Sequence, residues 1–329
     1  MGKGNMATDG KNSRFVVFID VLGIRRALSL GLPEIADRRI SSLASIVAEV
    51  LKAYPGLYAH GATDCFLIWT ETGELPWEII AATGFILQRY FDLNESENVT
   101  DLEHAFLLRA GLARGEASIH AAQTGKLSHA FLLGDGLARA YEAQALLPGM
   151  RFLFSLKTAK ATYLDEKNKP EKIPLIPLHK TYTHLGEIEA FDFLWGGAPK
   201  YAEKRLPRSC ALFEHALSEY RKEKIPERIL IQYLETARAI IRSCADPRLL
   251  LAYSSWQHDR PKFDKYYAGI WAAAWVRLFE VLGEEDLKRL KSVMRDKYVQ
   301  VAGSRVAGIV SEELKRRNLW KDVARLLKT

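Results

Sequence analysis

Two aspartates interrupt apolar stretches of the chain in a way that suits catalysis with a divalent cation. Asp20 ends the β-branched and aromatic run from Phe15 to Ile19, and Asp64 lies in a short polar segment between two further apolar runs. A carboxylate at the end of a buried strand is costly to desolvate, so it must lie at a rim, be paired, or bind a cation. Taken singly, each aspartate fits a turn or a strand cap equally well.

Taken together, the two aspartates indicate phosphoryl chemistry. If their strands are neighbours in one sheet, both carboxylates reach the same edge, where hard oxygen ligands hold Mg²⁺ or Mn²⁺. Two such ions would lower the charge on a triphosphate and help to deprotonate a ribose hydroxyl for in-line attack. The expected cofactor is therefore Mg²⁺ or Mn²⁺, with two ions per site.

The apolar periodicity predicts the elements that must position these carboxylates. Residues 14–23, RFVVFIDVLG, are typical of a buried strand, and residues 32–54 have the i, i+3, i+4 spacing of an amphipathic helix. Two strand-like runs, 57–60 and 65–70, enclose a tight turn, which places Asp64 near the tip of a hairpin.

Later segments continue the alternation of strands and helices. A helix over 76–91 precedes a long strand from His104 to Ser118, and AAQTGKLS at 121–128 has the composition of a loop. The order β-α-β-β-α-β-α-β favours an α+β fold, with helices packed on one face of a mostly antiparallel sheet. The remaining predicted elements are a helix over 134–147 and strands over 151–155 and 184–195.

A change in character near residue 200 predicts two regions after a polar leader of residues 1–13. Residues 14–200 contain the strands, whereas residues 201–329 show helical periodicity, which predicts an all-α C-terminal region. The net charge changes from −2 over residues 1–200 to +9 over the remainder. The basic region could bind nucleic acid, an acidic partner or a phosphorylated substrate, but a solvated helical surface explains it equally simply. Without basic and aromatic interleaving, nucleic acid is not expected as a partner.

Composition limits the class of protein further. The chain has 48% hydrophobic and 26% charged residues, and its apolar runs fall far short of the roughly 20 residues that a membrane span needs. The N-terminus has no apolar signal-peptide core, so a cytoplasmic protein without a membrane partner is expected. The three cysteines lack CxxC spacing, which argues against a structural zinc site or a disulfide framework.

Four segments within roughly residues 14–160 occur in a distinctive order and spacing. They are FIDVLGI (18–24), GATDCFLIW (61–69), LLRAGLARGEAS (107–118) and LLGDGLARAYEAQ (132–144). Together they resemble class III nucleotidyl cyclases and, more narrowly, the Pycsar antiphage cyclases that make cyclic CMP or cyclic UMP. The resemblance implies a class III cyclase-like sheet. It also implies a homodimer with its active sites at the interface, because these enzymes assemble each site across a two-fold axis.

The resemblance assigns roles to residues around the two aspartates. Asp20 and Asp64 match the metal-binding aspartates, and the carbonyl of Val21 matches a main-chain metal contact. Leu22 and Gly23 would offer backbone N–H groups to the triphosphate, as a strand-to-helix turn can do without bulky side chains.

The segment from 132 to 144 departs from the purine cyclases. Where they have an asparagine and an arginine that contacts the reacting phosphate, this chain has Ala138 and Glu142. Another cation must then stabilise the charge that develops on the phosphate. Arg139 is the first candidate for this catalytic role, and Arg114 and Arg109 are the alternatives. Each of the three could equally be a surface or ion-paired arginine.

The base-recognition positions also depart from the purine pattern. His60 replaces the purine-selecting lysine, and Phe131 replaces the selecting acid. Tyr58 lies two positions before His60, on the same face of its strand, and could stack on a base or donate a hydrogen bond to it. Tyr58 and Phe131 fit ordinary core positions as well. A smaller pocket closed by aromatic rings favours a pyrimidine.

The resemblance therefore implies a cyclase that converts UTP or CTP, with UTP slightly favoured, to the 3′,5′-cyclic nucleotide and pyrophosphate. The product would activate a separate effector in bacterial antiphage defence. The alternative, prompted by Ala138 and Glu142, is a catalytically degenerate cyclase-like protein that binds a nucleotide and regulates another protein.

Overall fold

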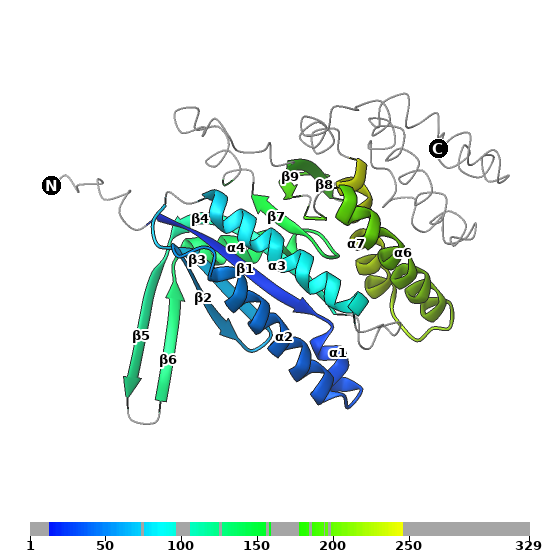
Figure 1. Ribbon diagram of the computed structural model, residues 1–329, viewed down its shortest axis with the longest axis horizontal. Helices are drawn as coiled ribbons and strands as arrows, with labels where there is room; N and C mark the ends of the chain where they lie inside the picture. Colours follow the sequence, from blue (N-terminus) through cyan, green and yellow to red (C-terminus); the bar gives the residue numbers. More distant parts are fainter. Residues whose placement is uncertain are drawn as a thin grey trace. The chain divides into compact units, whose positions relative to one another are not determined.

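The computed structural model describes residues 13–73, 76–96, 106–124, 127–155, 158, 178–183, 186–193, 195–196 and 199–245 (Figure 1). The chain divides into two compact units, and each is described by itself. The first comprises Met1–Asn94, Phe106–Glu171 and Glu189–Phe193, and the second comprises Glu95–Ala105, Lys172–Ile188 and Leu194–Thr329. The expected domain boundary at residue 200 stays a prediction.

The strand β1 (Ser13–Leu22) runs through the middle of the first unit and confirms the strand predicted over 14–23. Val16, Val17 and Ile19 are completely buried, since side chains on both faces of β1 meet packed neighbours. A run of β-branched and aromatic residues without strict alternation is what such a doubly covered strand requires.

β1 lies between β3 (Cys65–Thr70) and β4 (Leu107–Glu116) and is antiparallel to both. The order of the sheet is β2-β3-β1-β4-β7-β9-β8. The pairs β2–β3 and β7–β9 are antiparallel, and β4–β7 is parallel. The α+β fold with a mostly antiparallel sheet is thus confirmed. The other strands are β2 (Leu57–Ala62), β7 (Phe152–Ser155), β8 (Leu178–Thr183) and β9 (Gly186–Phe193).

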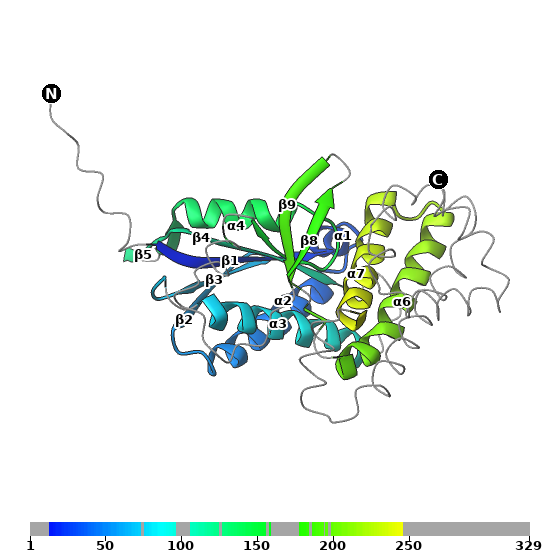
Figure 2. The same cartoon turned by 90° about the horizontal axis from the view of Figure 1, so that it is seen from above.

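Helices cover both faces of the sheet in the first unit, which corrects the expectation of helices on one face only. In Figure 2, α4 (Asp135–Ala145) lies on one side of the strands, and α2 (Pro33–Leu51) and α3 (Pro76–Ser96) lie on the other. All three helices were predicted. The pattern of apolar residues on a helix shows that one side is covered but not which face of a sheet covers it.

Two glycines of β4 allow α4 to approach the second face. A Cβ added at Gly111 would collide with the backbone carbonyl of Ala140, and a Cβ at Gly115 would lie 2.6 Å from the amide nitrogen of Gly136. No side chain larger than hydrogen fits at either position. The backbone of α4 therefore lies directly against β4 at two points.

The segment after β4 differs from its prediction. The predicted long strand over 104–118 is β4 only as far as Glu116, and a second strand, β5 (Ser118–Thr124), begins after Ala117. β5 pairs with β6 (Leu127–Leu133) in a separate two-stranded ribbon that projects from the unit in Figure 1. Of the predicted loop at 121–128, residues 121–124 belong to β5 and residues 127–128 to β6. The loop was predicted because these residues are mostly small or polar, but backbone pairing between strands does not depend on such side chains. The strand predicted over 184–195 is β9, and β8 was not predicted.

The described part of the second unit contains two long helices, as the helical periodicity predicted. They are α6 (Pro199–Arg221) and α7 (Glu227–Ala245), which pack against each other. α6 begins before the predicted start near residue 208 and continues through Pro207, which forfeits one backbone hydrogen bond without ending the helix. The helices predicted beyond residue 245 lie outside the described residues. Within the described ranges, no helix combines the length and apolar character needed to cross a bilayer.

Candidate active site

Asp20 lies near the end of β1, in one row with residues of both neighbouring strands. Cys65 on β3 and Arg109 on β4 are its direct antiparallel partners. The side chain of Asp20 is 22% exposed. The antiparallel register therefore brings a thiol, a carboxylate and a guanidinium together from segments that are 44 to 89 residues apart in the chain.

Asp64 lies at the tip of the β2–β3 hairpin, immediately before Cys65. Its backbone carbonyl accepts a hydrogen bond of 3.1 Å from the Val21 N–H, which ties the hairpin to the end of β1. Thr63 precedes it with a φ of 53°, and the Thr63 hydroxyl lies 3.1 Å from Asp64 Oδ1. The structure thus brings Asp20 and Asp64 to the same end of the sheet.

The negative charge of both aspartates acts on Cys65. Burial raises the pKa of the Cys65 thiol above its usual value, and the charges of Asp64 and Asp20 raise it further. The thiol contacts the Ala62 carbonyl at 3.0 Å. Two carboxylates that destabilise the same thiolate form one acidic patch, which favours a cation.

Arg109 forms an ion pair with this acidic patch. Its Nη2 lies 2.6 Å from Oδ2 of Asp20, and both side chains are 22% exposed. Of the three arginines considered for catalysis, Arg109 is the one that the structure places beside an aspartate of the pair.

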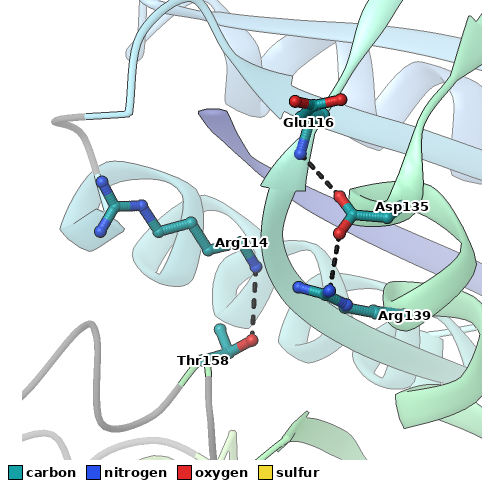
Figure 3. A network of polar contacts seen from close by, with 5 residues as sticks. All are labelled: Arg114, Glu116, Asp135, Arg139 and Thr158. Carbon is teal, nitrogen blue, oxygen red and sulfur yellow. Dashed lines mark hydrogen bonds and ion pairs between the residues drawn. The ribbon is translucent and has the colours of Figure 1, made fainter. Parts of the chain in front are cut away.

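Arg114, on β4, and Arg139, on α4, lie near Glu116, the last residue of β4 (Figure 3). Arg139 forms an ion pair of 2.7 Å with Asp135 at the start of α4, and the Asp135 carboxylate also accepts the Glu116 N–H at 2.7 Å. The Arg114 N–H donates to the Thr158 hydroxyl at 3.3 Å. Within one chain, the structure does not bring Arg114 or Arg139 to the acidic patch.

The separation between the two ends follows from the strand register. Arg114 is paired with Phe15, five residues before Asp20 on β1, which corresponds to about 17 Å along the strand. The Arg114 guanidinium lies over the Phe15 ring, 5.6 Å from its centroid. An arginine side chain is too short to cross the remaining distance.

Tyr58 and His60 lie on the same face of β2, as predicted, opposite Trp69 and Leu67 of β3. The Tyr58 ring stacks on Trp69 with a centroid distance of 6.1 Å and an interplanar angle of 14°. Tyr58 is 44% exposed and is therefore not a core residue. Trp69 received no role from the sequence, although its alternation with Leu67 placed it on this face.

Phe131 lies on β6, where its backbone is paired with His120. The surroundings of the Phe131 side chain lie outside what the structure describes. Its expected contact with a base remains a prediction.

Val21 and Leu22 are the last two residues of β1, and Gly23 links them to α1 (Ile24–Ser29), a short helix that was not predicted. Gly23 has a φ of 103°, and an added Cβ would lie 3.0 Å from the Phe106 ring. The backbone angle favours glycine here, and the space beside the Phe106 ring is tight for any side chain. The roles expected of these backbone groups toward a metal ion or a triphosphate stay predictions.

The donor atoms near Asp20 suit a hard divalent cation. Two carboxylates are enough for Mg²⁺ or Mn²⁺ when substrate phosphates and waters complete the coordination, and the carbonyl of Val21 is a further candidate. Across the described residues there is no cluster of three or more His, Cys, Asp or Glu side chains that could hold a metal ion.

Comparisons with known proteins gave matches among solved structures only. No protein-family model matches the chain, and no curated protein matches it. A bacterial light-regulated adenylyl cyclase is 19% identical over 56% of this chain and 90% of its own, with a TM-score of 0.42. The adenylyl cyclase CyaB from P. aeruginosa is 13% identical over 56% and 94%, with a TM-score of 0.43. The guanylate cyclase domain of RhGC from Catenaria anguillulae, in complex with GTP, is 15% identical over 55% and 96%, with a TM-score of 0.42.

Proposed function

We propose that this chain is a metal-dependent nucleotidyl cyclase with its active site at the Asp20 end of β1. The observation that carries the proposal is the meeting of Asp20 and Asp64 at one end of the sheet, through the β1–β3 register and the Val21–Asp64 hydrogen bond. Arg109 adds a cation beside this acidic patch. Carboxylates for metal ions together with an arginine for phosphate oxygens are the groups that phosphoryl transfer requires.

The proposed reaction closes a ring within one nucleoside triphosphate. The 3′-oxygen attacks the α-phosphorus, the bond from that phosphorus to the pyrophosphate oxygen breaks, and the hydroxyl proton passes to solvent. Two divalent ions at Asp20 and Asp64 would supply charge neutralisation and would acidify the hydroxyl. Arg109 would orient the phosphates, and Gly23 would keep the turn beside them free of a side chain.

The ion pair that holds Arg139 at Asp135, and not at Asp20, favours a homodimer in this proposal. A second copy, related by a two-fold axis, would bring its Arg139 or Arg114 to the carboxylates of the first. The face of the sheet that carries α4 has exposed aromatic rings suited to such a contact. Tyr141 of α4 is 55% exposed and meets Phe18 edge-on at 5.2 Å, and Tyr58 is stacked on Trp69 of the same hydrophobic cluster.

The proposed substrate is UTP or CTP, with UTP slightly favoured. Tyr58 offers a partly exposed ring that is stacked on Trp69. Neither Tyr58 nor His60 can replace the positively charged lysine that selects a purine. An aromatic surface of this kind stacks on a base without fixing its identity, so a polar group at the base edge must select it. In the same proposal, the cyclic product activates a separate effector in bacterial antiphage defence.

An assay with each of the four ribonucleoside triphosphates and Mn²⁺ tests the proposal. Pyrophosphate release and a cyclic product identified by mass spectrometry are expected with UTP or CTP. Asp20→Asn and Asp64→Asn should abolish both signals. Asp37→Asn is the matched control, because the same chemical change falls on an exposed position of α2. Absence of any cyclic product with all four substrates would exclude the cyclase.

A degenerate cyclase-like protein that binds a nucleotide is the second candidate. It is favoured by the ion pair that holds Arg139 at Asp135 and by the exposed positions of Ala138 and Glu142, which supply no cation. This candidate predicts nucleotide binding by calorimetry that depends on Asp20, without pyrophosphate release at any protein concentration.

A further inference from the structure

The ion pair of Arg109 with Asp20 engages the carboxylate that the proposed function assigns to a metal ion. Nη2 and Oδ2 are 2.6 Å apart, and both side chains are mostly buried. A guanidinium at this distance supplies the positive charge that a divalent cation would otherwise supply. The free protein therefore carries its own counter-ion at Asp20.

Arg109 is incompletely hydrogen-bonded in this position. Its Nε is buried and has no hydrogen-bond partner in the part of the chain that the structure describes. Buried donors in a permanent structural ion pair are normally satisfied. The Arg109 side chain can thus leave Asp20 without breaking a complete set of hydrogen bonds.

We propose that Arg109 competes with the divalent cation for Asp20 and must release this carboxylate before the ion binds. The inference rests on the proposed function, since it takes Asp20 as a metal ligand. The negative charges of a triphosphate attract the guanidinium away from Asp20, so nucleotide and metal bind cooperatively. Without nucleotide, Arg109 keeps the affinity for the metal low.

Mn²⁺ binding to the full chain without nucleotide tests the competition, with the EPR signal of free Mn²⁺ as the measurement. Arg109→Gln is expected to bind Mn²⁺ about tenfold more tightly than the unaltered protein, because it removes a positive charge in contact with Asp20. Adding Asp20→Asn to this variant should remove the gain. Equal affinity in Arg109→Gln and the unaltered protein, or a gain that survives Asp20→Asn, overturns the proposal.

Arg89→Gln is the matched control for the loss of one arginine. Arg89 forms an exposed ion pair of 2.8 Å with Glu49 on the surface of the same unit. Because exposed pairs are strongly screened, this variant should keep the Mn²⁺ affinity of the unaltered protein. A tenfold gain in Arg89→Gln would mean that net charge, rather than contact with Asp20, governs the affinity, and would overturn the proposal.

An NMR titration keeps the proposal testable if Arg109→Gln does not fold. Mg²⁺ added to the ¹⁵N-labelled unaltered protein is expected to shift the Nε–H resonance of Arg109 and to leave that of Arg89 in place. Arg109→Lys identifies the resonance by its loss. An Arg109 signal that stays fixed while Mg²⁺ saturates Asp20 overturns the proposal.

The outcome is distinguishable from a failure of the proposed function. If no triphosphate is cyclised but Arg109→Gln gains Mn²⁺ affinity through Asp20, the cyclase proposal fails and the competition stands. If a cyclic product forms but the Mn²⁺ affinity of Arg109→Gln is unchanged, the cyclase proposal stands and the competition fails.

Discussion

An arginine is paired with an aspartate at each end of β4, but the two aspartates are held differently. Asp20 and Arg109 come from neighbouring strands and are both 22% exposed. Asp135 and Arg139 are four residues apart on α4 and are 48% and 36% exposed. Asp135 also accepts the Glu116 N–H and lies in the first turn of α4, where the helix dipole favours a negative charge.

The comparison shows that two ion pairs of similar length can hold their aspartates in different ways. The backbone decides, because a carboxylate that accepts a main-chain N–H is fixed in place, as Asp135 is. Among the described residues, Arg109 is the hydrogen-bond partner recorded for the Asp20 carboxylate, and this partner is a side chain that can move. In the proposed function, Asp20 exchanges its counter-ion, whereas Asp135 keeps it.

Asp20→Asn is expected to have the largest effect of the changes that test this contrast. The amide keeps the shape of the side chain but loses the charge that holds a cation, so turnover should fall by about a thousandfold. The free energy of unfolding should fall by about 2 kcal/mol, since the mostly buried Arg109 loses its charged partner but the amide can still accept a hydrogen bond from it. Pyrophosphate release and urea unfolding measure the two effects. Turnover within tenfold of the unaltered protein would remove the functional half of the contrast.

Gly111→Ala tests the close contact between α4 and the middle of β4. The new methyl group would collide with the Ala140 carbonyl, so the free energy of unfolding should fall by about 3 kcal/mol. Gly31→Ala is the control, because Gly31 has a φ of 73° but open space around it. It should lose only about 1 kcal/mol from backbone strain. Equal losses in urea unfolding would mean that α4 does not need the contact at Gly111.

Arg139→Ala tests whether Arg139 of one subunit reaches the Asp20 site of the other subunit in a dimer. Turnover should fall by about a hundredfold if Arg139 stabilises charge on the phosphate of the partner's substrate. Mixing this variant with Asp20→Asn should restore about a quarter of the normal turnover, since half of the dimers are mixed and each has one intact site. No recovery in mixtures that exchange subunits would place any catalytic arginine in the same chain as Asp20.

Asp135→Asn is expected to have the smallest effect. The amide oxygen can still accept the Glu116 N–H, and an exposed ion pair with Arg139 is lost, so the free energy of unfolding should fall by about 1 kcal/mol. Thermal unfolding at low and high salt measures it, and the difference should shrink at high salt. A loss of turnover as large as that of Asp20→Asn, without unfolding, would reverse the roles of the two aspartates.

The Asp20 end could be predicted from the sequence because its signals are local. The apolar run that ends at Asp20 and the two runs that flank Asp64 are typical of strands, and the short connection over 61–64 indicates a hairpin. The structure narrows this connection to Thr63 and Asp64, because β2 continues to Ala62. Placing both carboxylates at one edge then requires only that the first strand pair with the hairpin. The structure has this pairing, with Asp20 opposite Cys65.

The partner of Asp20 could not be predicted, because the register of β1 against β4 has no local signal. Arg109 was one of three candidate arginines, and the choice among them depends on a pairing across 89 residues. The sequence also did not predict that α4 covers the second face of the sheet. Gly111 and Gly115 can be recognised as its contact points only once the position of α4 is known. The β5–β6 ribbon was missed because Ala121, Ala122 and Gln123 are neither β-branched nor aromatic and therefore give no strand signal.

Thr63, at the tip of the β2–β3 hairpin, has a backbone conformation that lowers the stability of the protein. A β-branched residue in the left-handed region is strained by about 1 kcal/mol or more, and glycine or asparagine would adopt the same angle more easily. The threonine hydroxyl nevertheless lies within reach of the Asp64 carboxylate, which a glycine would leave without this neighbour. Efforts to make the molecule more heat-resistant should therefore leave this turn unaltered, although its backbone angle marks it as the obvious place to begin.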